Sequence, residues 1–144
     1  MRAGAGLAAI AAALFAGSVA STSASAQASL YDRLGGYPAI SAVTDDFIKN
    51  VAADKRINGF FAHTDIPSFR QKLIDFICVG TGGPCIYIGR DMASAHAGMG
   101  VKGRHFNALV QDLGKTLKKL KVPRKEQAEL AAILGPMKKD IVTR

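Results

Sequence analysis

The segment from residue 106 to residue 120 constrains the fold most, because its apolar residues recur with the 3.6-residue period of an α-helix. Val122 and Pro123 close the pattern, since proline cannot continue a helix. A helix of this kind is stable when its apolar face is buried, so the segment predicts a helical core. The stripe consists of Phe106, Leu109, Val110, Leu113, Leu117 and Leu120.

Two further amphipathic helices are predicted before this segment. The first is expected to start at Pro38, a residue common in the first turn of helices. The second is expected to start at Asp65, which can cap a helix, with Pro67 in its first turn. Their apolar stripes are Ile40, Val43, Phe47, Ile48 and Val51, and then Ile66, Phe69, Leu73, Phe76 and Ile77.

The remaining helices are expected to be short or to lie at the C-terminus. Ser29 and Asp32 have the spacing of a capping box and predict a very short helix. Residues 92–97 predict another, and one last helix is expected over residues 128–141. Residues 79–90 read as a loop, within which only residues 85–88 resemble a strand, too short for a sheet. The fold class is therefore all-α.

The first 26 residues do not resemble part of this domain. Arg2 is their only charged residue, the stretch from Leu7 to Ala20 is apolar, and Ala24 to Ala26 offer a cleavage site of small residues. This is the pattern of a secretory signal peptide, which predicts export, most simply to a bacterial periplasm. An uncleaved membrane anchor is the alternative, although the apolar stretch is short for a span. Residues 27–144 then form the folded domain, with no membrane span of its own.

The chain is basic, with a formal net charge of +8. A basic cluster near the end of the 106–120 helix has no aromatic residues between its charges, so a solvated helix face is favoured over a nucleic-acid surface. Its members are Lys115, Lys118, Lys119, Lys121, Arg124 and Lys125. We expect no nucleic-acid partner.

Two cysteines, Cys78 and Cys85, bracket a glycine-rich loop. In an exported protein an even number of cysteines favours a disulfide. Two free thiols at the ends of a flexible loop are the alternative. The sequence holds no CxxCH motif, so covalent attachment of a c-type haem is not indicated.

Few residues could carry chemistry. The chain has no GxSxG, HExxH or phosphate-binding glycine loop, and its only histidines are His63, His96 and His105. Zinc sites need three or four protein ligands, which these do not supply, whereas one haem needs only one. The residues alone therefore permit haem without indicating it, and an ordinary partly buried histidine remains the simpler interpretation of His96.

Short blocks along the chain resemble the group I truncated haemoglobins, in that family's order and with spacing that fits without gaps from about Ser29 onward. Each block is weakly specific, but together they are specific. The blocks are Leu30-Tyr31-Asp32-Arg33-Leu34-Gly35-Gly36, Ala39-Ile40, Phe60-Phe61, Thr64-Asp65, Gly82-Gly83-Pro84, Tyr87-x-Gly89-Arg90-Asp91-Met92, His96-Ala97-Gly98-Met99-Gly100 and His105-Phe106.

This resemblance implies a two-over-two helical sandwich that holds one b-type haem without covalent links. The family's proximal histidine falls on His96, whose second ring nitrogen would need a hydrogen-bond acceptor. Lys72 and Tyr87 fall where the family often places residues that reach the haem propionates; a solvent-facing lysine and a half-buried tyrosine are the alternatives. The other residues expected at the haem are Phe61, Leu73, Met92 and Phe106.

The side of the haem opposite His96 departs from the family. Ile48 stands where a tyrosine is common, and Phe69 and Leu73 stand where a glutamine is expected. With Phe47, these residues predict a distal pocket without hydrogen-bond donors. A donor to the partly negative bound dioxygen contributes about 1.5–3 kcal/mol, so we expect weak retention of dioxygen relative to carbon monoxide.

Three functions remain open. The first is reversible binding of a diatomic gas (oxygen, nitric oxide or carbon monoxide) by a monomer. The second is nitric oxide dioxygenation or peroxide chemistry, with a reductant that the sequence does not identify; the apolar distal pocket, which lacks an acid–base residue, argues against it. The third is a helical interaction module that needs no haem.

Overall fold

The computed structural model describes residues 26–143, and their regular secondary structure is entirely helical, as predicted. The predicted signal peptide, residues 1–26, lies outside the described residues except for Ala26. No helix in residues 26–143 combines the length and the apolar composition needed to cross a membrane. The longer helices are α2 (Gly36–Ala53), α3 (Ile66–Gly80), α5 (Gly103–Lys119) and α6 (Arg124–Leu134), and the short ones are α1 (Leu30–Leu34), α4 (Met92–His96) and α7 (Lys138–Ile141).

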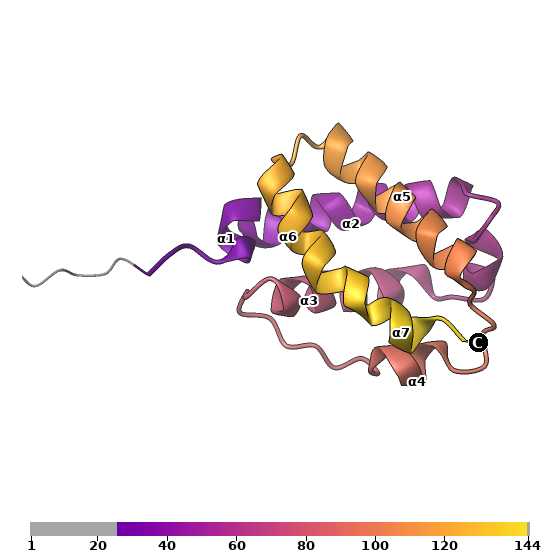
Figure 1. Cartoon of the computed structure of the whole chain (residues 1–144). Coiled ribbons are helices and arrows are strands. Elements are labelled where there is room, and N and C mark those ends of the chain that lie inside the picture. The colour runs from indigo at the N-terminus through magenta and orange to yellow at the C-terminus, as the bar shows by residue number, and fades with distance from the viewer. Residues whose placement is uncertain (1–25, 144) are drawn as a thin grey trace, which may run out of the picture.

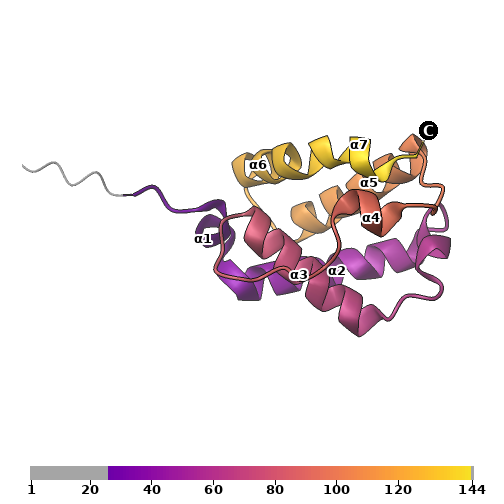
Figure 2. The same ribbon diagram turned by 90° about the horizontal axis from the view of Figure 1, so that it is seen from below.

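The four longer helices form two stacked pairs, which confirms the two-over-two arrangement. α2 packs against both α3 and α5 (Figure 1). Seen from below, α2 and α3 lie on one side, and α5 with α6 and α7 lies on the other (Figure 2). α4 packs against α7, at the end of a long segment without regular structure that follows α3. The stacking gives both pairs an inner apolar face.

The starts of α1 and α3 follow the caps that the sequence predicts. The Ser29 hydroxyl accepts a hydrogen bond from the Asp32 N–H while the Asp32 side chain bonds back to Ser29, which completes the capping box of α1. The Asp65 carboxylate accepts a hydrogen bond from the Ser68 N–H at the start of α3, and Pro67 lies in the first turn. These bonds satisfy N–H groups that have no partner within the helix.

Several boundaries differ from the predictions. α2 starts at Gly36, two residues before Pro38, and α3 continues to Gly80 into the predicted loop. The helix predicted over residues 128–141 is wrong as a single element. It is interrupted by a 3-10 turn at Gly135–Met137, because Pro136 cannot donate the backbone hydrogen bond of a continuous helix. Residues 85–88 form no strand.

The core consists of two apolar clusters, and the partly buried Leu73 and Leu113 pack against both. Two residues of the predicted 106–120 stripe lie outside it, since Val110 is 48% exposed and Leu120 is 39% exposed. The first cluster contains Leu30, Ile40, Val43, Ile74, Ile77, Cys78, Leu117 and Leu130, and the second contains Phe47, Val51, Ile57 and Ala108.

A polar seam, formed by Asp46, Asn50, Thr116 and Lys119, joins α2 and α5 beside this core. The buried Thr116 hydroxyl donates to Asp46 at 2.9 Å and accepts from the Asn50 side-chain amide at 2.9 Å. The Lys119 ammonium forms an ion pair with the same carboxylate. These contacts lower the pKa of Asp46, chiefly through the hydrogen bond from Lys119. The seam therefore fixes how the two helices cross, using residues that an apolar pattern cannot reveal.

Candidate functional site

His96 is the last residue of α4, and its side chain is half-buried. Its Nδ1 lies 2.7 Å from the carbonyl oxygen of Met92, one helical turn earlier. A carbonyl oxygen can only accept, so Nδ1 carries the proton and Nε2 keeps a free lone pair. Metal-binding histidines commonly have this arrangement, because the bond fixes both the tautomer and the ring orientation. The acceptor that the sequence left unidentified is therefore the Met92 backbone.

The short helix that carries His96 is held at its start by Asp91. The Asp91 carboxylate accepts hydrogen bonds from the Ser94 N–H at 2.9 Å and from the Ser94 hydroxyl at 2.7 Å. These bonds lower the pKa of Asp91, with the Ser94 backbone N–H contributing most. Sequence reasoning named neither as a site residue, although an aspartate directly before a short predicted helix is a recognisable capping signal.

The predicted distal residues come together around a small cavity of about 30 Å³. Phe47 and Ile48 of α2 meet Phe69 of α3 there, and the Phe61 ring lies 5.4 Å from the Phe69 ring between centroids. Leu73 does not line this cavity and packs between the two core clusters instead. The described residues that line the cavity are all apolar: Phe47, Ile48, Val51, Ala52, Phe61, Ile66 and Phe69.

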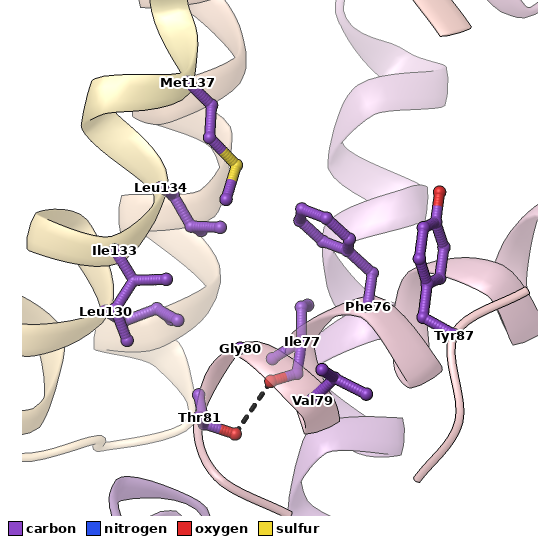
Figure 3. A pocket seen from close by; sticks show the side chains of 10 residues that line it. All are labelled: Phe76, Ile77, Val79, Gly80, Thr81, Tyr87, Leu130, Ile133, Leu134 and Met137. Carbon is purple, nitrogen blue, oxygen red and sulfur yellow. Dashed lines mark hydrogen bonds between the residues drawn. The ribbon is translucent and has the colours of Figure 1, made fainter. Parts of the chain in front are cut away.

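A larger apolar cavity, of about 140 Å³, lies between α3 and α6 (Figure 3). Phe76 points toward Leu134 and Met137 across it, and Tyr87 stands beside Phe76. The polar groups of its lining are engaged elsewhere, since the Thr81 hydroxyl donates to the Ile77 carbonyl. The lining residues are Phe76, Ile77, Val79, Gly80, Thr81, Tyr87, Leu130, Ile133, Leu134 and Met137. Of these, sequence reasoning singled out only Tyr87 as a site residue.

Tyr87 and Lys72, the residues expected at the haem propionates, have different surroundings. The Tyr87 hydroxyl donates to the Arg90 carbonyl at 2.7 Å, and its ring packs edge-on against Phe76 at 5.2 Å between centroids. Lys72 is exposed on α3, and no residue of the described part of the chain hydrogen-bonds to its ammonium group. The Lys72 side chain is therefore available to an anion.

Phe106 of α5 is buried, with the Lys138 ammonium 5.7 Å from its ring centroid. Phe106 lines neither cavity, and the same is true of Met92, His96 and Lys72. The structure thus groups the predicted site residues in three places: the distal cavity, the α4 helix with His96, and Tyr87 beside the larger cavity. Phe106, Lys72 and Leu73 lie apart from these groups.

Cys78 and Cys85 form a disulfide, so the alternative of two free thiols is wrong. Cys78 is fully buried near the end of α3, and Cys85 is half-buried in the following segment. The turn between them passes so close that a Cβ on Gly83 would lie 2.5 Å from the Tyr31 ring and 2.6 Å from the Cys78 sulfur. Only glycine fits at this position.

The predicted site residues fit a haem. A histidine with a free Nε2 can bind iron, the apolar side chains around the two cavities can pack on a porphyrin face, and an exposed lysine can pair with a carboxylate. His63 and His105 fit less well. His63 is exposed, and the His105 Nδ1 accepts a hydrogen bond from the Lys102 N–H. His96 is therefore the best-prepared metal ligand among the three histidines.

Known proteins resemble this chain over nearly all of its described length. The model of the family described as bacterial-like globin matches residues 29–143. A group 1 truncated haemoglobin of Tetrahymena pyriformis is 36% identical over 113 residues, which cover 78% of this chain and 93% of that protein.

Solved structures agree with this similarity. The iron(III) form of the truncated haemoglobin from Tetrahymena pyriformis superposes with a TM-score of 0.78 at 35% identity, covering 81% of this chain and all of the other. The 2/2 haemoglobin of Synechococcus sp. PCC 7002, solved in the cyanomet state with covalently attached haem, gives 0.77 at 34% identity with the same coverage.

Proposed function

Because the chain belongs to the bacterial-like globins and, among them, to the group 1 truncated haemoglobins, we propose that it is a reversible binder of diatomic gases, with one haem held through His96. The hydrogen bond from His96 Nδ1 to the Met92 carbonyl carries the proposal. It leaves Nε2 free for iron and keeps the ring from rotating. When bound, the haem iron supplies a coordination position for a small diatomic molecule.

The remaining residues of the proposed haem site pack against the haem or pair with its charged groups. Phe61, Leu73, Met92 and Phe106 supply apolar surface, which a porphyrin face requires. Lys72 supplies a charge for a propionate, while Tyr87 supports the haem edge through its ring, because its hydroxyl is bound to Arg90. We propose a non-covalent b-type haem, as both cysteines are committed to the disulfide.

The distal cavity determines which gases are retained. Phe47, Ile48 and Phe69 exclude water there, and the described lining residues offer no hydrogen-bond donor. A bound dioxygen would therefore lack the stabilisation that a donor provides, whereas the less polar carbon monoxide loses little. The same lining offers no acid–base group, so nitric oxide dioxygenation and peroxide chemistry are not favoured.

We further propose that the protein works outside the cytoplasm as a monomer. The charged start, apolar stretch and small-residue site of residues 1–26 support export. The disulfide supports the same proposal, since disulfides persist in oxidising compartments.

Absorption spectra of the ferric, reduced and carbon monoxide forms test the haem and its ligand together. The full chain is compared with a His96→Ala variant and with the matched control His63→Ala, at an exposed histidine. We expect a Soret band that shifts with carbon monoxide in the native chain and in the control, and that is lost or altered in His96→Ala. A native spectrum in His96→Ala would exclude His96 as the ligand, and no Soret band in the native chain after haem addition would exclude the function.

A further inference from the structure

The segment that connects α3 to α4 has little to hold it in place. Residues 84–90 form no backbone–backbone hydrogen bond with the rest of the described chain. The alternate residues Ile86 and Ile88 are 79% and 86% exposed. Neither a backbone ladder nor burial of these large side chains stabilises its position, yet the segment leads directly into the helix that carries His96.

Two side chains on its inner face anchor this segment. The sulfur of Cys85 is bonded to Cys78, a fully buried core residue of α3. Two residues later, the Tyr87 ring packs against Phe76 at 5.2 Å between centroids. The Tyr87 ring also passes close over Gly89, where a Cβ would lie 2.2 Å from the Tyr87 hydroxyl oxygen, so a side chain at position 89 would displace the Tyr87 ring.

A continuous series of contacts links this anchor to His96. The Tyr87 hydroxyl donates to the Arg90 carbonyl at 2.7 Å. The next residue, Asp91, caps α4 through Ser94, and the Met92 carbonyl orients the His96 ring. A shift of Tyr87 would therefore change both the wall of the larger cavity and the start of α4.

We propose that the Cys78–Cys85 disulfide is a positioning element of the haem site, which acts by holding Tyr87 against Phe76. The disulfide fixes Cys85 to α3 only two residues before Tyr87, so this part of the segment cannot move far from the helix. The disulfide thereby keeps the Tyr87 ring at the wall of the larger cavity, although the residues on either side of Tyr87, Ile86 and Ile88, are exposed. The inference rests on the proposed haem binding and assigns the disulfide a role beyond general stability.

The rate of haem loss tests the inference. Ferric protein, loaded with haem, is mixed with excess apomyoglobin, and haem transfer is followed in the Soret region. The full chain is compared with Cys78→Ala/Cys85→Ala, with Tyr87→Ala and with the triple variant. The control Ile86→Ala removes an apolar side chain from the outer face of the same segment.

We expect the double cysteine variant and Tyr87→Ala each to lose haem roughly tenfold faster, and the triple variant to be no faster than either, because residues that act through one another are not additive. Ile86→Ala should lose haem at the native rate. Unchanged rates, or effects that multiply in the triple variant, would overturn the inference, since a merely structural disulfide acts independently of Tyr87.

Hydrogen exchange of the full chain gives a second measurement should the cysteine variant bind haem too weakly. Faster exchange confined to the hydrogen-bonded amides of α4 in that variant supports the local role of the disulfide, while equally faster exchange in α2 and α5 contradicts it. Failure of the haem function itself is recognised separately, by the absence of a Soret band in the native chain.

Discussion

At the scale of single residues, the candidate site depends on backbone groups as much as on side chains. His96 is oriented by a carbonyl oxygen, Ser94 donates its N–H to Asp91, and Tyr87 is held by the Arg90 carbonyl. Each of these bonds joins residues three or four positions apart. A short segment can therefore hold the proposed metal ligand, His96, in a defined orientation through local hydrogen bonds.

Replacing Asp91 with alanine should make the orientation of the His96 ring less well defined. The variant removes the carboxylate that accepts two hydrogen bonds from Ser94, so the first turn of α4 frays and the Met92 carbonyl no longer holds the ring as firmly. We expect faster haem loss in Asp91→Ala, measured by transfer to apomyoglobin. Asp91→Asn, which retains a side-chain oxygen acceptor, should stay near the native rate, and equal rates for both variants would show that the cap does not matter.

A donor introduced at position 48 should strengthen dioxygen retention. Ile48 lines the distal cavity, and the hydroxyl of Ile48→Tyr could reach a bound ligand there. A hydrogen bond to this partly charged ligand contributes about 1.5–3 kcal/mol, which corresponds to roughly 10- to 150-fold slower dioxygen dissociation in flash photolysis. Ile48→Phe is the matched control, because it adds the ring without the hydroxyl. Slow dissociation from the native chain would refute the donor-free pocket, and equal dissociation from the two variants would refute the expected effect of a hydroxyl at position 48.

At the scale of elements, helix pairing depends on more than apolar stripes. α2 and α5 pack through Phe47, Val51 and Ala108, but Asp46 and Thr116 are buried beside them. A buried hydroxyl and carboxylate are tolerated because each finds a partner across the crossing. The angle and register of this pair therefore depend on a hydrogen-bond network as well as on shape.

Asp46→Ala should destabilise the domain by about 1–3 kcal/mol, because it leaves the Thr116 hydroxyl without its acceptor. Urea unfolding measures this loss. Asp45→Ala, which removes a partly exposed ion pair with Arg70, is the control and should cost less than about 1 kcal/mol. Equal losses in the two variants would contradict the role of the seam.

The same carboxylate makes stability depend on acid pH. The pKa of Asp46 is lowered in the folded protein, so its contribution is present above the unfolded pKa of about 4 and is lost as the pH falls through the folded value. The free energy of unfolding, measured at several pH values from 6 down to 2, should therefore decrease less in Asp46→Ala than in the native chain. An unchanged pH profile would argue against an ionised Asp46 in the fold.

At the scale of the whole molecule, the site is assembled from segments far apart in the sequence. The distal cavity combines α2, the 3-10 helix Asn58–Phe61 and α3, while His96 comes from α4. The larger cavity joins α3 to α6 and the turn that follows it (Figure 3). The disulfide connects the core to the segment between these regions.

Export is a property of the whole chain. Expressed at full length in a Gram-negative host, the protein should appear in the periplasmic fraction with an intact mass that starts at Gln27, because the small residues Ala24 and Ala26 match a signal-peptidase site. Ala24→Phe/Ala26→Phe should retain the longer chain at the membrane. A full-length native chain in the cytoplasm would contradict the proposal.

Periodic and local signals were sufficient for much of this protein. Helical spacing predicted α2, α3 and α5, and short-range caps predicted α1 and the start of α3, because these features depend on neighbours within one or two turns. Short sequence blocks that resemble the family predicted the family correctly, and they also predicted His96 as the haem ligand. The Cys78–Cys85 pair was predicted with an alternative that the structure removed.

Only the tertiary structure decided which groups meet across the molecule. Three features depend on which segments pack together in the fold: the exposure of Val110, the burial of Thr116 and the packing of Tyr87 on Phe76. The sequence alone does not show which segments are neighbours. The apolar stripe of a single helix indicates which face of that helix is buried, because burial repeats with the helix period. The crossing of two helices determines which polar residues at the edge of the stripe can form hydrogen bonds with each other, as Thr116 and Asp46 do. Only the tertiary structure shows this crossing.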